Sequence, residues 1–274
     1  MPELPEVETI ARDVRPSLVG ATILRVRLFK SDVLRGISSP AFRRALQGRS
    51  VTSVTRRAKH LVILLDDGVR LVIQPRMTGS LTVTRRDDTD PYAVIEADLS
   101  RGGRLRYRDV RRLGAVHVLA PAAWKRYDAR IGPEPLERAF TPARLAAALA
   151  GGTLAVKKAL MDQRRLAGVG NIYANEALWR ARVDPSRLAR TLAPAEVRRL
   201  HAALVTILRS AIRGRGTTVR DYRTGTGEAG GFQDRLDVYG RAGLGCRRCG
   251  PKHRIALTHA IDQRATYFCP GCQH

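Results

Sequence analysis

The four cysteines of the chain form two C-x2-C pairs near its end, Cys246 with Cys249 and Cys269 with Cys272. Two such pairs separated by residues 250–268 match the ligand spacing of one tetrahedral zinc site, because each pair turns two thiolates toward the same ion. Four thiolates leave no coordination position for water, so the expected Zn²⁺ is structural and not catalytic. Disulfides are not expected in a reducing cytoplasm, and four scattered buried thiols would not explain the pairing.

The N-terminus offers a second group that could do chemistry. Removal of Met1 would leave Pro2 with a secondary amine, and since an α-amino group titrates near ~8, part of it is a neutral nucleophile at pH 7. Glu3 and Glu6 follow, and a carboxylate on the adjacent residue is close enough to act as a general acid or base. From these residues alone the simpler interpretation is favoured, namely a rigid start before a helix for Pro2 and compensation of the helix dipole for both acids.

The charge of the chain points to a polyanionic partner. Lysine and arginine number 49 against 25 aspartate and glutamate residues, which leaves a formal charge of +24. A positive field of this size, spread along the chain, attracts nucleic acid, although a proteome that favours arginine would also raise it. A hydrophobic content of 44% excludes wholesale disorder. The absence of an apolar run of about 18 residues argues against a membrane span. The acidic opening MPELPEVETI is unlike a signal peptide, so a cytoplasmic location is expected.

The first half of the chain must position these groups with one helix and many strands. Residues 3–18 predict a helix, with Pro5 in its first turn and Gly20 closing it. From about 21 to 120 the pattern changes to period two with β-branched residues, which is typical of strands. Two hairpins are expected, around the turns at Asp66–Gly68 and Arg101–Gly103.

The second half, after Gly132, predicts helices. A helix, a glycine-rich turn and a further helix would present backbone N–H groups to a phosphate. Residues 214–235 are rich in glycine, threonine and charge and predict a mobile loop, and the zinc module should begin near Asp237. The expected helices run from a Thr141 cap to Gly151, from a Thr153 cap to Met161, from about Asn171, and from about Pro194 to Ile212.

The chain contains, in this order, the motifs MPELPEVET, RRAKHL, RMTGSL, DVRRLG, GPEPL, LMDQRRLAGVGNIYANEAL, GTTVRDY, VYGR and QRATYFCPGCQ. These motifs resemble those of the formamidopyrimidine-DNA glycosylases, the bacterial base-excision repair enzymes for oxidised purines. They lie in family order and span essentially the whole chain, so together they are very specific. The resemblance implies an α+β multidomain fold: an N-terminal helix plus β-sandwich over 1–131, a helix–two-turn–helix domain over 132–236 with a lesion-recognition loop at 214–235, and a zinc-finger hairpin over 237–274.

For this family the resemblance assigns a chemical role to five residues. The Pro2 amine attacks the sugar C1′ of the damaged nucleotide, expels the base and forms an iminium, which acidifies the C2′ proton for β-elimination. Glu3 is implied as the general acid/base, and Glu6 as the residue that orients the lesion pocket and a water. Lys59, which alone would be a solvated charge in the turn of RRAKH, is implied to bind the phosphate beside the lesion. Arg264 is implied to grip phosphates and assist δ-elimination.

Further residues are implied to hold the DNA. An extruded base leaves a hole in the stack, and the family fills it with three side chains. This chain departs from the usual D-P-R-R/K-F-G motif, because Leu113 stands where the family has phenylalanine and can wedge but stacks less well. The alternative is that Leu113 packs inside the sandwich. The spacer between the zinc pairs is also longer than expected. The implied DNA-binding residues are Met77, Arg111 and Leu113 in the void, Lys157 and Asn171 on phosphates, and Thr217, Thr218 and Arg220 facing the base.

Three functions are compatible with these motifs. The first is a bifunctional purine glycosylase and abasic-site lyase that acts as a bacterial monomer on damaged or abasic double-stranded DNA, in the cytoplasm and associated with the nucleoid. The second is an endonuclease VIII-like enzyme for oxidised pyrimidines with the same Pro2 chemistry. The endonuclease VIII-like branch typically opens with PEGPE, so the opening PELPEVE of this chain favours the first function. The third is a zinc protein that binds nucleic acid without catalysis. The presence of Pro2, Glu3, Lys59 and Arg264 together argues against it.

Overall fold

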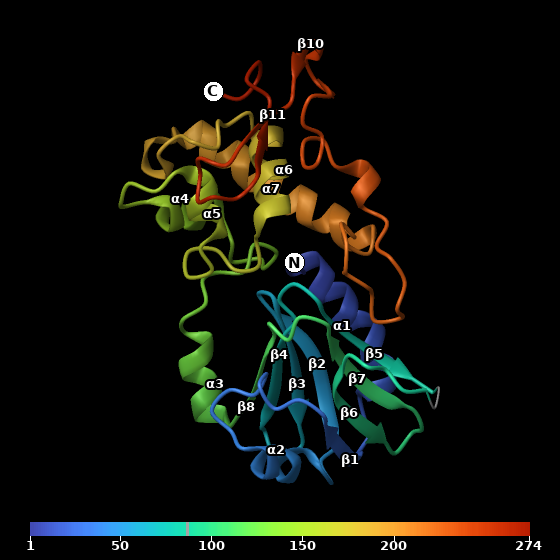
Figure 1. Cartoon of the computed structure of the whole chain (residues 1–274). Helices are drawn as coiled ribbons and strands as arrows, with labels where there is room; N and C mark the ends of the chain where they lie inside the picture. Colours follow the sequence, from blue (N-terminus) through green and yellow to red (C-terminus); the bar gives the residue numbers. More distant parts are fainter. Residues whose placement is uncertain (86–87) are drawn as a thin grey trace. The chain divides into compact units, whose positions relative to one another are not determined.

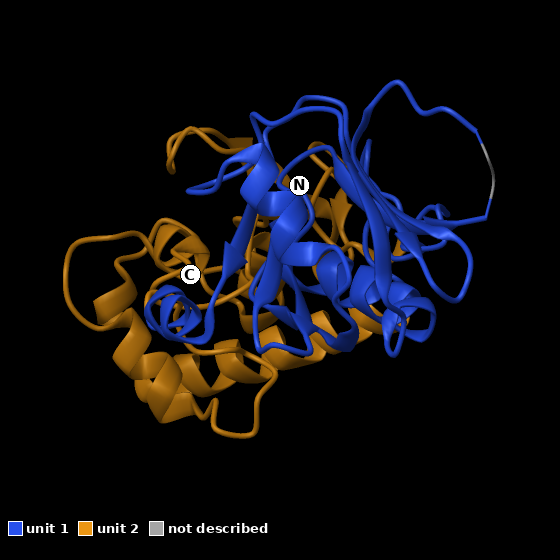
Figure 2. Ribbon diagram, turned by 90° about the horizontal axis from the view of Figure 1, so that it is seen from below, with its two compact units in different colours: residues 1–129, 214–233 blue, residues 130–213, 234–274 orange. Residues whose placement is uncertain are grey.

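The structure, a computed structural model, describes residues 1–85 and 88–274. It consists of two compact units, which Figure 2 colours separately. Unit 1 comprises residues 1–129 and 214–233, and unit 2 comprises residues 130–213 and 234–274. The loop after the long helix therefore returns to the N-terminal unit. The three domain boundaries expected from the sequence stay a prediction.

Unit 1 opens with helix α1 (Leu4–Leu18), as the sequence predicts. Pro5 lies in the first turn of the helix. Proline is tolerated there because the backbone N–H that it lacks would have no partner within the helix. Glu3 is its N-cap, and Gly20 follows its end with φ +77°, a left-handed conformation that glycine adopts without strain. Val7 and Ile10 belong to the apolar face that α1 buries in the core.

Two four-stranded antiparallel sheets follow α1 and confirm the expected β-sandwich (Figure 1). Apolar side chains of both sheets and of α1 form one continuous core, because alternate residues of each strand point to the same face. Both predicted hairpins are present, β3 with β4 and β6 with β7. One sheet has the order β1 (Ile23–Leu28), β6 (Ala93–Leu99), β7 (Arg104–Asp109), β5 (Gly79–Thr84), and the other β2 (Val51–Arg57), β3 (His60–Leu65), β4 (Arg70–Gln74), β8 (Ala115–Leu119).

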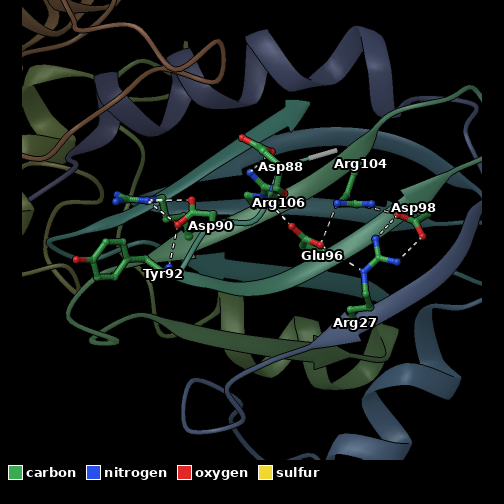
Figure 3. A network of polar contacts seen from close by, with 9 residues as sticks. Arg27, Asp88, Asp90, Tyr92, Glu96, Asp98, Arg104 and Arg106 are labelled. Atoms are coloured by element: carbon green, nitrogen blue, oxygen red, sulfur yellow. Dashed lines mark hydrogen bonds and ion pairs between the residues drawn. The ribbon is translucent and has the colours of Figure 1, made fainter. Parts of the chain in front are cut away.

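The face of the first sheet that points away from the core carries a network of charges (Figure 3). At its centre Glu96, only 4% exposed, accepts from Arg106 at 2.7 Å and from Arg27 at 3.3 Å. Each arginine in the network is matched by an acidic residue, so the network carries no net charge. The matched residues are Arg27, Arg104, Arg106 and Arg108 on one side and Asp88, Asp90, Glu96 and Asp98 on the other.

Two short helices of unit 1 were not predicted. Helix α2 (Ser39–Leu46) interrupts the stretch expected to be strands, so that expectation is wrong here. A start signal was present, because Ser38 caps the helix by accepting from the Ala41 N–H at 3.4 Å and Pro40 lies in the first turn. Helix α3 (Pro121–Asp128) follows β8 and buries none of its residues fully, which explains its weak apolar pattern.

Unit 2 contains the helical part of the chain. The helices α4 (Pro142–Leu149), α6 (Asn171–Ala181) and α7 (Pro194–Arg213) confirm the expected ones, and Thr141 caps α4 through the Arg144 N–H. The expected Thr153 cap is wrong: α5 (Val156–Met161) begins later and has no side-chain cap. Residue 155 instead forms an isolated bridge with residue 188, so the chain before α5 is held by strand-type pairing.

The zinc-finger part of unit 2 consists of four short strands, β9 (Gly245–Cys246), β10 (Gly250–Arg254), β11 (Ala256–Thr258) and β12 (Thr266–Phe268). Strand β12 packs against α6, and a small core around Trp179 contains three of the cysteines. The hairpin β11–β12 carries the loop 259–265. Within the described residues, no helix combines the length and apolarity needed to cross a membrane.

Candidate active site and metal centre

The N-terminal residues lie at the start of α1 beside two buried carboxylates. Pro2 is buried while Met1 before it is 48% exposed, and Glu3 and Glu6 are 2% and 1% exposed. The backbone N–H of Glu3 donates to Glu6 Oε2 at 2.8 Å. The other oxygen, Glu6 Oε1, accepts from the backbone N–H of Thr217 at 2.8 Å. Glu6 therefore does more than compensate the helix dipole, since it joins the prolyl end of the chain to the loop at 214–233.

The loop at 214–233 is tied to α1 at a second point. Asp13 accepts from both terminal nitrogens of Arg215 at 3.1 Å and from the Gly225 N–H at 2.9 Å. Gly216 has φ +81°, and a Cβ there would lie 2.9 Å from Glu6 Oε1, so only glycine fits against the carboxylate. The segment forms neither a helix nor a strand before residue 233, as expected, yet its backbone is held in place by these contacts.

The three loop residues expected to face the base differ in exposure. Thr217 is 3% exposed, and the hydroxyl of Thr218 accepts from the Gly230 N–H at 2.8 Å while donating to the Tyr222 carbonyl at 3.1 Å. Arg220 is exposed and has no hydrogen bond or ion pair within residues 1–85 and 88–274. The two threonines therefore shape the loop, and Arg220 has its guanidinium free for a ligand.

Lys59 lies in the two-residue turn between β2 and β3, as the motif indicates, but it is not a solvated charge. It is 7% exposed. Ala58 takes a left-handed conformation with φ 53°, and the Nδ1–H of His60 donates to the Arg57 carbonyl at 3.0 Å, which closes the turn. Burial, with added repulsion from nearby positive groups, lowers the pKa of His60 to about 4, so the ring beside Lys59 is neutral at pH 7.

The predicted void-filling side chains are exposed. Met77 is 42% exposed and Leu113 40% exposed, and a guanidinium nitrogen of Arg111 lies 3.6 Å from the Met77 sulfur. The alternative that Leu113 packs inside the sandwich is therefore wrong. An exposed leucine and methionine flanking an arginine are the side-chain types that wedge into a base stack.

Asp109, a residue without a role in the sequence analysis, holds the loop that carries Arg111. It is 1% exposed, and one of its oxygens accepts from the Thr78 hydroxyl while the other accepts from the Gly114 N–H at 2.8 Å. The same hydroxyl oxygen of Thr78 accepts from the Arg111 N–H at 3.0 Å. A Cβ at Gly114 would lie 1.9 Å from the Tyr107 hydroxyl, so glycine is required where the loop closes.

In unit 2 three of the predicted phosphate-binding residues converge on one short segment. Lys157, 1% exposed, donates from Nζ to the Ala265 carbonyl at 3.0 Å and to the Thr266 hydroxyl at 2.7 Å. Asn171 donates from Nδ2 to the same carbonyl at 3.0 Å. Arg264, next in the chain to this acceptor, keeps an exposed side chain.

Two further residues of α6 contact the zinc-finger part and were missed by the sequence analysis. Asn175 accepts from the Tyr267 N–H at 2.9 Å. Glu176, 1% exposed, accepts from three consecutive backbone N–H groups, of residues 237, 238 and 239, at 2.8 to 3.0 Å. Asn175 lies four residues after Asn171 on the same face of α6, and that spacing is a signal that could have identified it.

The four cysteines meet at one point and could hold a metal ion. Their sulfur atoms lie within 4.8 Å of one another, and Cys249 Sγ is 3.8 Å from Cys269 Sγ. Zinc–sulfur bonds of about 2.3 Å in a tetrahedron place the sulfur atoms roughly 3.8 Å apart, so the spacing fits such an ion. The donor set is four sulfurs with no carboxylate or imidazole, as expected for a structural site.

Hydrogen-bond donors around this centre favour the thiolate form of Cys246, whereas burial raises the pKa of Cys249, Cys269 and Cys272. The indole N–H of Trp179 donates to Cys246 Sγ at 3.4 Å, and Arg248 donates to Cys272 Sγ at 3.5 Å. Burial acts to raise the pKa of Cys246, but hydrogen bonds from the Cys249 backbone, from the indole and from the Arg248 backbone together lower it to about 6. Cys246 is therefore a thiolate at neutral pH, which is the form that binds a metal ion.

Comparison with known proteins matches nearly the whole chain. The family model described as the formamidopyrimidine-DNA glycosylase N-terminal domain matches residues 1–116, and the one described as the H2TH domain of the same enzymes matches residues 131–223. A formamidopyrimidine-DNA glycosylase of Chloroflexus aggregans is 43% identical, with 100% of this chain and 98% of the relative covered.

Solved structures agree along the full length. A mutant of the Lactococcus lactis enzyme, in complex with DNA that contains Fapy-dG, has a TM-score of 0.92 at 30% identity, with 100% of both chains covered. The wild-type L. lactis enzyme in complex with DNA that contains an oxidised pyrimidine has a TM-score of 0.90 at 30% identity, also with 100% of both chains covered.

Proposed function

This chain belongs to the formamidopyrimidine-DNA glycosylase family, and from that premise we propose that it excises oxidised purines, 8-oxoguanine and formamidopyrimidines, and then cleaves the abasic strand. The observation that carries the proposal is the start of α1, where Pro2 directly precedes two buried carboxylates in a full-length match to the family. Its proposed partner is damaged or abasic double-stranded DNA. Action as a monomer in the cytoplasm, on nucleoid DNA, stays a prediction from the resemblance.

The proposed chemistry begins with removal of Met1. The neutral Pro2 nitrogen forms a bond to C1′, the bond from C1′ to the base nitrogen breaks, and the base leaves with the electron pair and takes up a proton. Opening of the sugar ring gives the iminium, with Glu3 delivering a proton to the ring oxygen. Loss of a C2′ proton then expels the 3′ phosphate by β-elimination, and a second elimination expels the 5′ phosphate.

The remaining site residues hold the DNA in this proposal. Glu6 orients the pocket, and Lys59 and Arg264 bind phosphates next to the lesion. Phosphate contacts position the duplex without reading its sequence. The other proposed contacts are those of Met77, Arg111 and Leu113 in the emptied stack, Asn171 near a phosphate, and Thr217, Thr218 and Arg220 at the base. The resemblance also implies Lys157 on a phosphate, but its Nζ is buried and donates to Ala265 and Thr266, so its proposed contribution is indirect.

Borohydride trapping tests the proposal. The protein is incubated with an 8-oxoguanine:cytosine duplex, and the iminium is reduced to a stable covalent adduct. We expect an adduct whose mass places the DNA on Pro2. Pro2→Gly should keep some lyase activity through its primary amine, whereas a protein that retains Met1 should lose both steps. Full activity of a protein shown by mass spectrometry to retain Met1 would contradict the proposal.

The same assay separates the alternatives. One similar L. lactis structure contains an oxidised-pyrimidine DNA, so oxidised pyrimidine is the second substrate class to offer. An adduct with that duplex alone would indicate the endonuclease VIII-like function. No adduct with either duplex, at measurable DNA affinity, would indicate a non-catalytic binding protein.

We also propose that the four cysteines hold one structural Zn²⁺. The ion would fix the β-strands around the loop of Arg264, and it would take no part in bond breaking because four thiolates complete its coordination. Cys249→Ser should lose one equivalent of metal and most DNA affinity. Metal analysis that finds no zinc in the intact protein would contradict this assignment.

A further inference from the structure

The buried ammonium of Lys157 is the starting point for a second assignment. A lysine that is 1% exposed is stable only if its charge is met by acceptors, because burying an unpaired ammonium is costly. Lys157 Nζ meets the Ala265 carbonyl at 3.0 Å and the Thr266 hydroxyl at 2.7 Å. Both acceptors lie directly after Arg264 in the chain.

The direction of these hydrogen bonds extends the contact to Arg264 itself. An ammonium can only donate, so the Thr266 oxygen accepts from Lys157 and keeps its own proton to donate. That proton goes to the Arg264 carbonyl, whose oxygen lies 3.0 Å from the Thr266 hydroxyl. Hydrogen bonds linked in this way polarise one another, so the charge of Lys157 strengthens the bond that holds Arg264.

Helix α6 holds the same segment from a second side. Asn171 and Asn175 donate from their amide nitrogens to the Ala265 carbonyl at 3.0 and 3.5 Å, and Asn175 accepts from the Tyr267 N–H at 2.9 Å. The backbone from Arg264 to Tyr267 is therefore held at every residue. The Arg264 guanidinium, by contrast, is 51% exposed, and among residues 1–85 and 88–274 it makes only a long contact of 3.7 Å to Asp262.

We propose that Lys157 is a positioning residue for Arg264, acting through the Ala265 carbonyl and the Thr266 hydroxyl. The assignment rests on the proposed function, in which Arg264 binds a DNA phosphate. A clamped backbone below a free guanidinium presents the arginine in one place and lowers the ordering needed when the phosphate arrives. The neighbouring Lys158 is 46% exposed and pairs with Asp262 at 3.2 Å, so the two adjacent lysines have different tasks.

A double-mutant cycle tests the assignment. Lys157→Met, Arg264→Gln and the double variant are compared for the rate of δ-elimination and for the Kd of a duplex that contains an abasic-site analogue. We expect Lys157→Met to slow δ-elimination as Arg264→Gln does, by a factor on the order of 100, since small displacements of a positioning group cost that much. The double variant should be no slower than Arg264→Gln alone, because Lys157 acts only through Arg264.

A direct contact between Lys157 and DNA predicts the opposite result. If Lys157 contacted a phosphate independently, the factors by which the two substitutions reduce rate and affinity would multiply in the double variant. Lys157→Met would also reduce the slope of log Kd against log salt by about 0.9, even in the Arg264→Gln protein. Either result overturns the assignment. It is also overturned if Arg264→Gln changes neither measurement, and in that case trapping at Pro2 still tests the proposed function separately.

Two controls keep the cycle interpretable. Lys125→Met removes the same charge from an exposed helical position in unit 1 and should change nothing. Thr266→Val leaves Lys157 paired with Ala265 but removes the bond to the Arg264 carbonyl. If Lys157→Met loses zinc or fails to fold, Thr266→Val becomes the variant that tests the assignment. A slower δ-elimination with zinc content unchanged supports the assignment, and an unchanged rate overturns it.

Discussion

Both carboxylates at the head of α1 are held by backbone N–H groups, since the Glu3 side chain accepts from the Glu6 N–H and the Glu6 side chain accepts from the Glu3 N–H. Both oxygens of Glu6 accept backbone N–H groups, from Glu3 and from Thr217. A carboxylate held in this way is a poor proton shuttle but a good anchor, because its charge is already compensated. This supports Glu6 as the group that orients the pocket, and the role of Glu3 as general acid/base stays a prediction from the resemblance.

Leu113 gives a prediction at the level of one side chain. Leu113→Phe should improve discrimination between damaged and normal pairs in duplex DNA, because an aromatic ring offsets more of the few kcal/mol lost on unstacking. Single-turnover rates on an 8-oxoguanine:cytosine duplex and on an abasic single strand measure this. The single strand should react at an unchanged rate, since little stacking is lost there. Equal slowing of both substrates would count against a wedge.

His60 gives a prediction about pH. Its pKa of about 4 in the folded protein lies below the ordinary value of 6.5, so between these pH values the unfolded chain binds a proton that the folded chain does not. Stability contributed by the neutral ring is therefore present above pH 6.5 and is lost as the pH falls toward 4, by up to about 3 kcal/mol.

Urea unfolding at pH 7 and pH 4.5 checks this expectation. His60→Phe cannot titrate and keeps a ring against Tyr127, which contacts the imidazole edge-on with centroids 5.7 Å apart. The free energy of unfolding should fall less with pH in this variant than in the wild type. His259→Phe, at an exposed position, should leave the wild-type dependence unchanged. A pH dependence shared by all three proteins would contradict the assignment to His60.

Among the elements, the loop at 214–233 is held by contacts made outside itself. It has little regular structure, and α1 holds it through Glu6 and Asp13. Tyr222 also packs into the apolar core, whereas residues 226–229 are exposed, so the loop combines a defined shape with a segment that can move. This is the behaviour required of the proposed lesion-recognition loop.

Asp13→Asn tests the loop at this level. Asparagine keeps the shape but removes the charge that binds Arg215, and charge-assisted hydrogen bonds are the stronger ones. We expect amides of 215–227 to exchange hydrogen roughly tenfold faster, and turnover of 8-oxoguanine to fall more than cleavage of an abasic site. Glu8→Gln is the matched control, because Glu8 lies on the same helix but pairs with Arg12 and Arg56. Equal exchange in both variants would rule out the Asp13 clamp.

Over the whole molecule the positive charge is unevenly distributed. The chain carries a formal charge of +24, yet the outer face of the sheet with strands β1 and β5–β7 matches each arginine of its network with an acidic residue (Figure 3). The excess charge therefore lies elsewhere on the molecule. DNA affinity should accordingly depend on where a positive charge is removed and not on the net charge alone.

Two charge-matched variants check this. Arg264→Gln and Arg104→Gln each remove one positive charge, the first from the proposed phosphate contact and the second from the neutral network. The wild type should lose affinity steeply as salt rises, and Arg264→Gln should reduce the slope of log Kd against log salt by about 0.9. Arg104→Gln should leave the slope unchanged. Equal slopes for both variants would show that net charge alone governs binding.

Local patterns of residues were enough to predict those parts of this protein that depend on neighbouring residues. The C-x2-C pairs, the hairpins around Gly68 and Gly103 and the helix at Asn171 follow from local spacing and turn chemistry. Motif order identified the family for the same reason, since each motif is a short run of adjacent residues. Helix α2 shows the limit of this approach, because its eight residues were too short a pattern among strands.

Tertiary structure alone decided which side chains are buried and what they bind. Two lysines that are ordinary charges in the sequence, Lys59 and Lys157, are buried. Glu6 and Thr217 are separated by 211 residues and Lys157 and Thr266 by 109, yet each pair is hydrogen-bonded. Such contacts form only when folding brings distant segments of the chain together, and a buried polar group then needs a hydrogen-bond partner because it has lost contact with water. No local pattern of residues specifies which residue becomes that partner.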